Sequence, residues 1–511
     1  MTILRLVLAF GLLSTATASS LSSSAQSVNT WLRRAHSGGK TGEQTFLPLL
    51  PTQTEFPELF FSQPLDHFSK SLGITFGQRY WVNARHYVKG GPVIVLDGGE
   101  TSGEDRLPFL DTGIVDILAT ATNGLGIVLE HRYYGASIPV KNFSTDAMRW
   151  LNNAQALQDS ARFVANFQWN GEDLSAPKTK WIYYGGSYAG ARSAHVRVLF
   201  GDLIYGSLAS SAVTHAAINF WEYNEAIRTT ANQTCTSLLT AVVAYIDGLL
   251  SLPLIKNRLK SRFGLSGLDD QDFASVLSTP TSYVQAQNWD PQVGSDTWPR
   301  FCQALGSGKA NSAIGPIRRQ ALLSNYAQWI REEVVSGCTT SIVDCFGTRN
   351  ATQYQDTGLS QTWRAWQWQV CTEWGYFIGA PPDPHYPTIV SRRLTLEYTS
   401  QICRQAFPAG TYARVPAWPN VTAVNALGDF TIAKDRLAFI DGYQDPWRPA
   451  TPHSWYAPAR PDTLVRPFKM IKTGLHHYDE NGLKNHTLEP PQIRHIHTEE
   501  VEFVKFWLGL V

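Results

Sequence analysis

The stretch KWIYYGGSYAG, residues 180–190, decides the fold expected for this chain. Its first half is an apolar, aromatic run typical of a buried strand, and a helix is expected to start near Ala189. A serine on a tight strand-to-helix turn is held in a strained conformation that lifts its hydroxyl above the sheet, and it needs small residues two positions away on either side. Gly185 and Ala189 meet that need, although Ala189 replaces the second glycine of the general pattern G-x-S-x-G. Ser187 is therefore the predicted nucleophile.

Apolar segments on both sides of this motif predict a sheet. The strand-like runs are QRYWVNARHYV (78–88), PVIVLD (92–97), GIVLEHRYY (126–134), RLAFID (436–441) and LVRPFKMIK (464–472). Helical patterns separate them, as in NNAQALQDSARFVANF (152–167), and a further one, TEEVEFVKFWLGL (498–510), follows the last run. Strands that alternate with helices favour a parallel sheet covered on both faces.

Between these strands, residues 215–355 are typical of amphipathic helices and predict an inserted cap. The predicted fold class is α/β: an α/β-hydrolase fold whose core comes from residues 51–214 and 356–511, with a mostly helical cap between them. No internal repeat is found.

The first residues indicate export. Residues 1–18 combine Arg5, an apolar run and the small residues Ala16-Thr17-Ala18, the pattern of a cleaved signal peptide. Residues 19–50 are rich in Ser, Gly and Thr and are expected to be a linker or a removable pro-segment. No later stretch offers about 20 apolar residues without charges or breaks, so no membrane anchor is expected. A net charge of +1 favours neither nucleic acid nor an anionic membrane as a partner.

Sequons and cysteines agree with export. Five N-x-Ser/Thr sequons predict glycosylation at Asn142, Asn232, Asn350, Asn420 and Asn485. With an export signal, an even number of cysteines and no CxxC spacing, disulfides are favoured for Cys235, Cys302, Cys338, Cys345, Cys371 and Cys403. The histidines from His476 to His497 match no HExxH spacing, so we expect neither a metal site nor a cofactor.

A serine nucleophile needs a histidine to take its proton and a carboxylate to orient that histidine. In this fold the order along the chain is serine, acid, histidine. Two downstream loops that follow strands offer these groups, DGYQDPW (441–447) and GLHHYD (474–479). The residues alone leave Asp441 and Asp445 open as the acid, and His476 and His477 open as the base.

Acyl transfer also needs two backbone N–H groups that stabilise the oxyanion. One comes from the residue after the nucleophile, Tyr188, and the other from the loop after an earlier strand. The loop Asp97-Gly98-Gly99-Glu100 follows the run PVIVLD, and Gly99 is the preferred second donor.

From about Phe61 onward the chain resembles the lysosomal and secreted serine peptidases that include prolyl carboxypeptidase, dipeptidyl peptidase II and fungal acid prolyl endopeptidases. The motifs that carry the resemblance are FSQPLDHF, FGQRYWVN, EHRYYGASIP, GGSYAG, SLASSAV, QWQVCTEWGYF, DGYQDPW and GLHHYDENG. The resemblance implies Asp445 as the acid and His476 as the base, although Asp441 replaces the family's usual Asn. It also implies cleavage after proline, often best at acidic pH, and the pairs Cys235–Cys302, Cys338–Cys345 and Cys371–Cys403.

These observations predict a secreted serine peptidase that acts through an acyl-enzyme on a peptide or protein, with Trp447 in a proline pocket. Carboxypeptidase, dipeptidyl peptidase and endopeptidase activity all stay open. An esterase or lipase, or a non-catalytic binding protein on the same scaffold, are the alternatives, because a fold does not fix the substrate. The expected location is extracellular or vacuolar/lysosomal, and the oligomeric state stays open, a homodimer included.

Overall fold

An eight-stranded sheet lies at the centre of the computed structural model, which describes residues 55–69 and 73–510. The expected signal peptide (1–18) and linker (19–50) fall outside the described residues. The strands are β1 (Leu59–Pro64), β2 (Thr75–Asn83), β3 (Val93–Asp97), β4 (Leu125–Leu129), β7 (Trp181–Gly186), β8 (Gly206–Ser210), β11 (Leu437–Gly442) and β12 (Phe468–Ile471).

The strand order is β1-β2-β4-β3-β7-β8-β11-β12. The pairs β1–β2 and β2–β4 are antiparallel, and all pairs from β4 to β12 are parallel. A mixed sheet of this order with helices on both faces is the α/β-hydrolase fold, so the predicted fold class is confirmed.

Alternating side chains of β3 supply the two faces of the core. Val93 and Val95 belong to an apolar cluster with residues of α5 (Asn153–Asn166) and α6 (Tyr188–Leu199). Ile94 and Leu96 belong to a second cluster with residues of α3 (Ile114–Thr122) and α18 (Pro491–Leu508). Because successive side chains of a strand point to opposite faces, one strand is buried on both sides.

Outside the long insertion, the remaining helices and strands are short. They are η1 (Gly103–Arg106), α2 (Leu107–Asp111), α4 (Thr145–Met148), β5 (Gln168–Trp169), β6 (Glu172–Asp173), η7 (Arg448–Ala450) and η8 (His486–Leu488).

One expected strand is shorter than its sequence indicates. The run 126–134 leaves the sheet after Leu129, where the buried side chain of Glu130 binds Arg79 at 2.7 Å and accepts the N–H of Ser137 at 2.9 Å. A buried carboxylate needs such partners, and collecting them bends the chain away from the strand direction.

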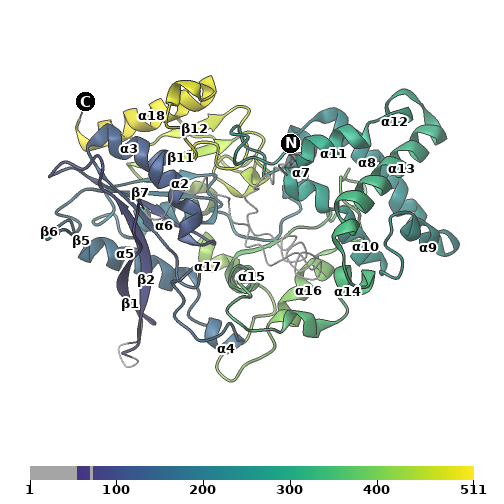
Figure 1. Ribbon diagram of the computed structural model, residues 1–511, viewed down its shortest axis with the longest axis horizontal. Coiled ribbons are helices and arrows are strands. Elements are labelled where there is room, and N and C mark those ends of the chain that lie inside the picture. The colour runs from purple at the N-terminus through teal and green to yellow at the C-terminus, as the bar shows by residue number, and fades with distance from the viewer. Residues whose placement is uncertain (1–54, 70–72, 511) are drawn as a thin grey trace, which may run out of the picture.

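A long insertion separates β8 from β11. It contains β9 (Ala217–Asn219), α7 (Glu222–Thr230), α8 (Gln233–Leu250), α9 (Pro253–Arg262), α10 (Asp270–Leu277), η2 (Thr279–Tyr283), α11 (Thr297–Leu305), α12 (Lys309–Ser312), α13 (Gly315–Glu333), η3 (Val335–Gly337), α14 (Ile342–Phe346), η4 (Ala351–Tyr354), α15 (Trp363–Gln369), η5 (Val370–Trp374), β10 (Gly375–Phe377), α16 (Leu396–Ala406), α17 (Val421–Asn425) and η6 (Asp429–Thr431). In Figure 1 helices α8 to α13 gather at one end of the molecule, away from β1 and β2 at the other. The chain rejoins the central sheet at Leu437. That the helical cap ends at residue 355 stays a prediction.

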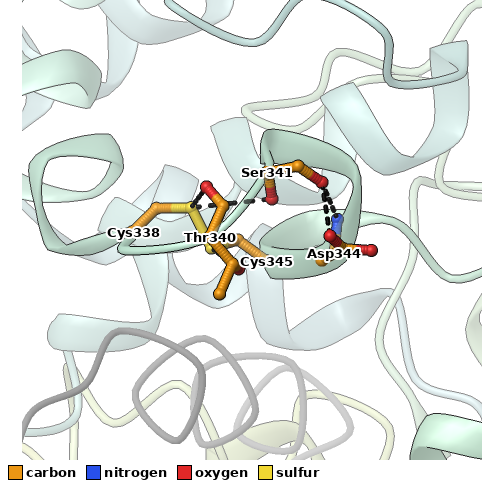
Figure 2. The surroundings of a disulfide bond; sticks show 5 residues. All are labelled: Cys338, Thr340, Ser341, Asp344 and Cys345. Atoms are coloured by element: carbon orange, nitrogen blue, oxygen red, sulfur yellow. Dashed lines mark hydrogen bonds between the residues drawn. A yellow bond between two sulfur atoms is a disulfide. The ribbon is translucent and has the colours of Figure 1, made fainter.

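Three disulfides stabilise this insertion. They join Cys235 to Cys302, Cys338 to Cys345 and Cys371 to Cys403, the same pairs that the resemblance implies. The first links α8 to α11, and the third links η5 to α16. Figure 2 shows the second, with Ser341 at the start of α14 and Asp344 within that helix, where the Ser341 hydroxyl accepts the N–H of Asp344.

One described helix, α8, is long and apolar enough to cross a membrane by length and composition alone, and 44% of its residues are buried in the protein. Its buried side chains, among them Leu239, Val242 and Ile246, belong to the same apolar cluster as those of α11 and α13.

Candidate active site

Ser187 occupies a strained turn between β7 and α6. Its φ of 59° and ψ of −121° lie outside the regions that non-glycine residues favour. The turn is tight enough to exclude side chains beside it: a Cβ on Gly185 would lie 2.1 Å from the carbonyl oxygen of Ala189, and one on Gly190 would lie 2.6 Å from that of Ser210. The glycines therefore permit the conformation that raises the serine hydroxyl above the sheet.

His476 joins this serine to a carboxylate. Its Nε2 lies 3.1 Å from Oγ of Ser187, and its Nδ1 lies 2.8 Å from Oδ2 of Asp445. Because a carboxylate only accepts, Nδ1 carries the proton and Nε2 is free to accept the serine proton. The three residues come from the ends of β7, β11 and β12, where α/β sheets collect their functional groups.

Asp445 is held in its charged form. Burial alone would raise the pKa of this fully buried carboxyl, but the charge and hydrogen bond of His476 lower it below its usual range. The N–H of Trp447 donates to it at 2.8 Å, and the Ser211 hydroxyl adds a further hydrogen bond. The carboxylate thus stays negative while it faces the imidazole.

The neighbouring candidates have other partners. Asp441 lies 2.6 Å from Nδ1 of His453, and that ring stacks on Phe468 with centroids 3.5 Å apart. The ring of His477 packs at a tilt against that of His476, with centroids 3.8 Å apart, and its Nδ1 lies 3.1 Å from the carboxylate of Glu480. The structure therefore brings Asp445 and His476 to Ser187, and not Asp441 or His477.

A backbone donor for the oxyanion is available at one side of the site. Tyr188 is the first residue of α6, where a helix N–H has no partner within the helix. Gly99 lies against the same turn, since a Cβ on it would be 3.3 Å from that of Ala189. Its own N–H, however, donates to the Asp97 carboxylate at 3.0 Å, so the role of Gly99 as the second donor stays a prediction.

Asp97 fixes this loop to the nucleophile helix. Its Oδ2 lies 2.8 Å from Nε of Arg192 on α6 and accepts the Tyr183 hydroxyl at 2.7 Å. Burial works against its charge, but Arg192 keeps the pKa of Asp97 below its usual range. The distance between the loop and the helix is therefore set by a buried ion pair.

The sequence analysis did not assign a role to three residues near the triad: Ser211, Arg106 and Glu480. Ser211 is held at a φ of 44° just after β8 and accepts the N–H of His477 at 3.2 Å through its hydroxyl. Arg106 donates to the carbonyl of Gly98 at 3.2 Å and lies 3.9 Å from Glu480. The position of Ser211 after a buried strand was a usable signal, whereas no local pattern marks Arg106 or Glu480.

Trp447 is almost fully buried, with 3% of its surface exposed. Its ring stacks on Phe220 with centroids 5.3 Å apart, meets Tyr223 and Tyr376 edge to face, and has its centroid 6.4 Å from that of His476. Its indole N–H donates to Gln285 of the insertion at 2.8 Å. The ring thus links the acid loop to the cap.

Among the described residues one group has the composition of a metal site: His486, Glu489 and His497. Glu489 is buried and lies 2.8 Å from Nδ1 of His486 and 3.1 Å from Nδ1 of His497. The other ring nitrogen of His497 lies 3.0 Å from the carbonyl of Asp479. Glu489 and His497 therefore have hydrogen-bond partners within the protein. The expected absence of a metal site stays a prediction.

All five sequon asparagines are exposed, at Asn142, Asn232, Asn350, Asn420 and Asn485. In each the side-chain oxygen accepts a nearby backbone N–H, which turns the amide nitrogen, the atom that carries a glycan, away from that bond. Glycosylation stays a prediction.

The chain is similar to several known serine peptidases. It is 38% identical over 492 residues, 89% of this chain and 68% of the relative, to a probable extracellular serine carboxypeptidase of Arthroderma benhamiae. It is 30% identical over 461 residues, 83% of this chain and 84% of the relative, to the serine protease vicPa of Bipolaris victoriae. It is 29% identical over 422 residues, 78% of each chain, to the thymus-specific serine protease of Homo sapiens.

Solved structures give a weaker likeness. The peroxisomal alpha-beta-hydrolase Lpx1 of Saccharomyces cerevisiae is 10% identical with a TM-score of 0.32, over 88% of this chain and 89% of that one. The family described as serine carboxypeptidase S28 matches residues 63–495, most of the chain, which confirms the resemblance seen in the motifs. With that match beside a serine, a histidine and an aspartate in contact, the chain belongs to the serine carboxypeptidase S28 family of serine peptidases.

Proposed function

We propose that Ser187, His476 and Asp445 are the catalytic residues and that the enzyme cleaves peptide bonds after proline. The observation that carries the first part is the position of His476, within hydrogen-bonding distance of both partners. Family membership supports the second part, because the sequence motifs resemble those of peptidases that act after proline.

The mechanism follows from these contacts. Oγ of Ser187 attacks the carbonyl carbon while His476 Nε2 takes its proton, and the negative oxygen is stabilised by the N–H of Tyr188 and by the loop of Gly99 and Glu100. The imidazolium then protonates the leaving amine as the C–N bond breaks, which leaves an acyl-enzyme. A water molecule, deprotonated by the same imidazole, attacks the ester, and the serine recovers its proton as the acid product leaves.

Trp447 is proposed as one wall of the proline site. An indole ring is broad, rigid and apolar, and it can hold a pyrrolidine ring at small entropic cost. The nearness of its ring to that of His476, with centroids 6.4 Å apart, supports this role, since a wall of the pocket has to lie beside the reacting bond.

We also propose that the protein is exported and works outside the cytosol on peptides or proteins. Three disulfides, five exposed sequons and the name of the extracellular relative support this location.

The test uses Ser187→Ala beside the parent enzyme. Loss of the nucleophile is expected to lower turnover of a blocked prolyl substrate by about 10⁴-fold to 10⁶-fold and to abolish labelling by a fluorophosphonate. Thermal unfolding that matches the parent would show that the variant is folded. Activity within about tenfold of the parent would remove Ser187 from the mechanism, and turnover of short acyl esters without any prolyl peptide would favour an esterase.

A further inference from the structure

A cavity of about 660 Å³ lies between the insertion and the two loops that carry the acid and the base. Its volume falls within the range of roughly 300–1,000 Å³ that is usual for ligand sites. Helices α8 and α11, joined by the Cys235–Cys302 disulfide, form one side of it. The disulfide fixes the distance between these two helices.

The opposite side belongs to the catalytic loops. Gln444 and Leu475 line the cavity, and each stands one position before a proposed catalytic residue, Asp445 and His476. The N–H of Gln444 donates to the carbonyl of Gly474 at 3.0 Å, so the two loops meet as one wall. A chain bound in the cavity would therefore lie within a few residues of the reacting bond.

The cavity also adjoins the aromatic cluster around Trp447. Gln285 accepts hydrogen bonds from the Trp447 indole at 2.8 Å and from the Tyr223 hydroxyl at 2.7 Å. Its neighbours Val284 and Gln287 line the cavity. The same short segment of the insertion thus separates the proposed proline site from this space.

The lining is uncharged and combines amide side chains with apolar ones. Among the described residues that line it there is no Asp, Glu, Lys, Arg or His, and its polar side chains outside the sequon of Asn232 are all amides: Gln287, Gln303, Asn311 and Gln444. A chain terminus carries a charge, and sites that bind one supply the opposite charge. Amide side chains both donate and accept hydrogen bonds, as a peptide backbone does.

We infer that this cavity binds an uncharged, polar stretch of a long peptide, remote from the scissile bond, and that the enzyme favours such internal sequences over chain ends. The inference rests on the proposed function, whose reaction it extends. Trp298 adds one large aromatic surface to the lining, so that an extended segment meets both amides and an apolar face.

The experiment compares a short blocked prolyl substrate with a long neutral peptide that contains one proline. Remote contacts raise the efficiency of the chemical step, so kcat/KM of the parent is expected to be about tenfold higher or more on the long peptide. Gln303→Trp fills the cavity from an exposed position on α11 and is expected to remove that gain while leaving the short substrate unaffected. Gln287→Glu is the second variant, and it should favour long peptides with a Lys in the remote stretch.

Gln328→Trp is the matched control, because Gln328 is an exposed glutamine on α13 outside the cavity. This variant should keep the full increase in kcat/KM on the long peptide. A parent without any gain, or a gain that survives in both cavity variants, would overturn the inference even if the short substrate is cleaved. If no substrate is cleaved, the proposed function fails instead, and binding of the long peptide to Ser187→Ala with and without Gln303→Trp still decides the role of the cavity.

Discussion

Asp441 and Asp445 stand four residues apart, yet their surroundings affect their charges in opposite directions. Burial dominates at Asp441 and raises the pKa of its carboxyl, although His453 opposes the shift. At Asp445 the charge of His476 outweighs burial and lowers the pKa. A carboxyl that stays ionised is the one that can orient and stabilise an imidazolium.

A pair of substitutions tests this difference. Asp445→Asn is expected to lower kcat by about 10⁴-fold because the amide favours the wrong imidazole tautomer. Asp441→Asn should leave most activity, since its partner His453 does not contact Ser187. Turnover of a prolyl substrate measures both, with thermal unfolding as the control for folding. Equal losses in the two variants, or a larger loss in Asp441→Asn, would contradict the assignment.

Trp447 is tested by the ratio of two substrates. A residue of the proline pocket contributes to the difference between transition states, so Trp447→Ala should lower kcat/KM for proline substrates at least about tenfold more than for alanine substrates. Trp455→Ala, at a Trp with 41% of its surface exposed, is the control. An unchanged ratio with both rates reduced would make Trp447 a wedge that positions the acid loop, in line with its buried ring.

Residues alone could identify Ser187 but not its partners. The elbow is a local pattern, because strain and the need for small neighbours are set within a few positions. Asp441 and Asp445 follow the same strand, and what separates them is His453, a contact that only the fold creates. The resemblance selected the pair that the geometry brings together. Gly99 as an oxyanion donor was harder to judge, because its N–H is taken by Asp97 through a turn that the sequence does not mark.

At the scale of elements, apolar runs predicted β2, β3, β4, β7, β11 and β12, most of which are parallel strands with both faces buried. They did not predict β1 or β8, and β8 is a buried parallel strand of small residues, GSLAS. The ends of elements were less predictable. The run 126–134 reads as one strand, but the buried Glu130 ends it at Leu129 by binding Arg79, whose position depends on another strand. The return of the chain to the sheet at Leu437 was predicted by the run RLAFID (436–441), whereas the helices up to α17 carry no signal that separates cap from core.

The disulfides differ in how far along the chain they reach. Cys235–Cys302 spans 67 positions and Cys338–Cys345 spans 7. A longer closed loop restricts the unfolded chain more, so removing the first pair as Cys235→Ala/Cys302→Ala is expected to cost about 4 kcal/mol and removing the second about 2 kcal/mol. Urea unfolding followed by tryptophan fluorescence measures both. A larger loss from the shorter loop would be the contrary result.

At the scale of the whole molecule, several buried acids titrate far from their usual range. Burial raises the pKa of Asp479 to about 6 and that of Glu373 to about 7. Glu500 lies beside Asp479, and burial with this like charge raises its pKa well above the usual value. Asp479 accepts the hydroxyls of Tyr184 on β7 and Ser210 on β8, so this acid lies against the two strands next to the nucleophile turn.

These acids predict a protein that is more stable in mild acid than at neutral pH. The folded state holds protons on Asp479 and Glu373 that the unfolded state releases above about pH 4. The free energy of unfolding should therefore fall as the pH rises from about 4 through 7, by roughly 3 kcal/mol for each group. Below about pH 4 the trend should reverse, because Asp97, Asp445 and Glu489 have lowered pKa values and lose their stabilising charges there.

Denaturant unfolding between pH 3.5 and 8 checks this profile. Glu373→Gln removes one titrating group, so the free energy of unfolding should fall less steeply between pH 5 and 7. The amide can still accept the N–H of Asn153, which keeps the local hydrogen bond. The exposed Glu332→Gln serves as the control. A protein most stable at pH 8, or the same slope in both variants, would rule these acids out as its cause.

The order of the catalytic groups along the chain also has a consequence for biosynthesis. Ser187 and His476 are 289 residues apart, with the whole insertion between them. At about 5–20 residues per second, a ribosome needs roughly 15–60 s to advance from the serine codon to the histidine codon. During that interval the nascent polypeptide has a nucleophile but no base, so a prematurely released fragment would be inert toward the proteins around it.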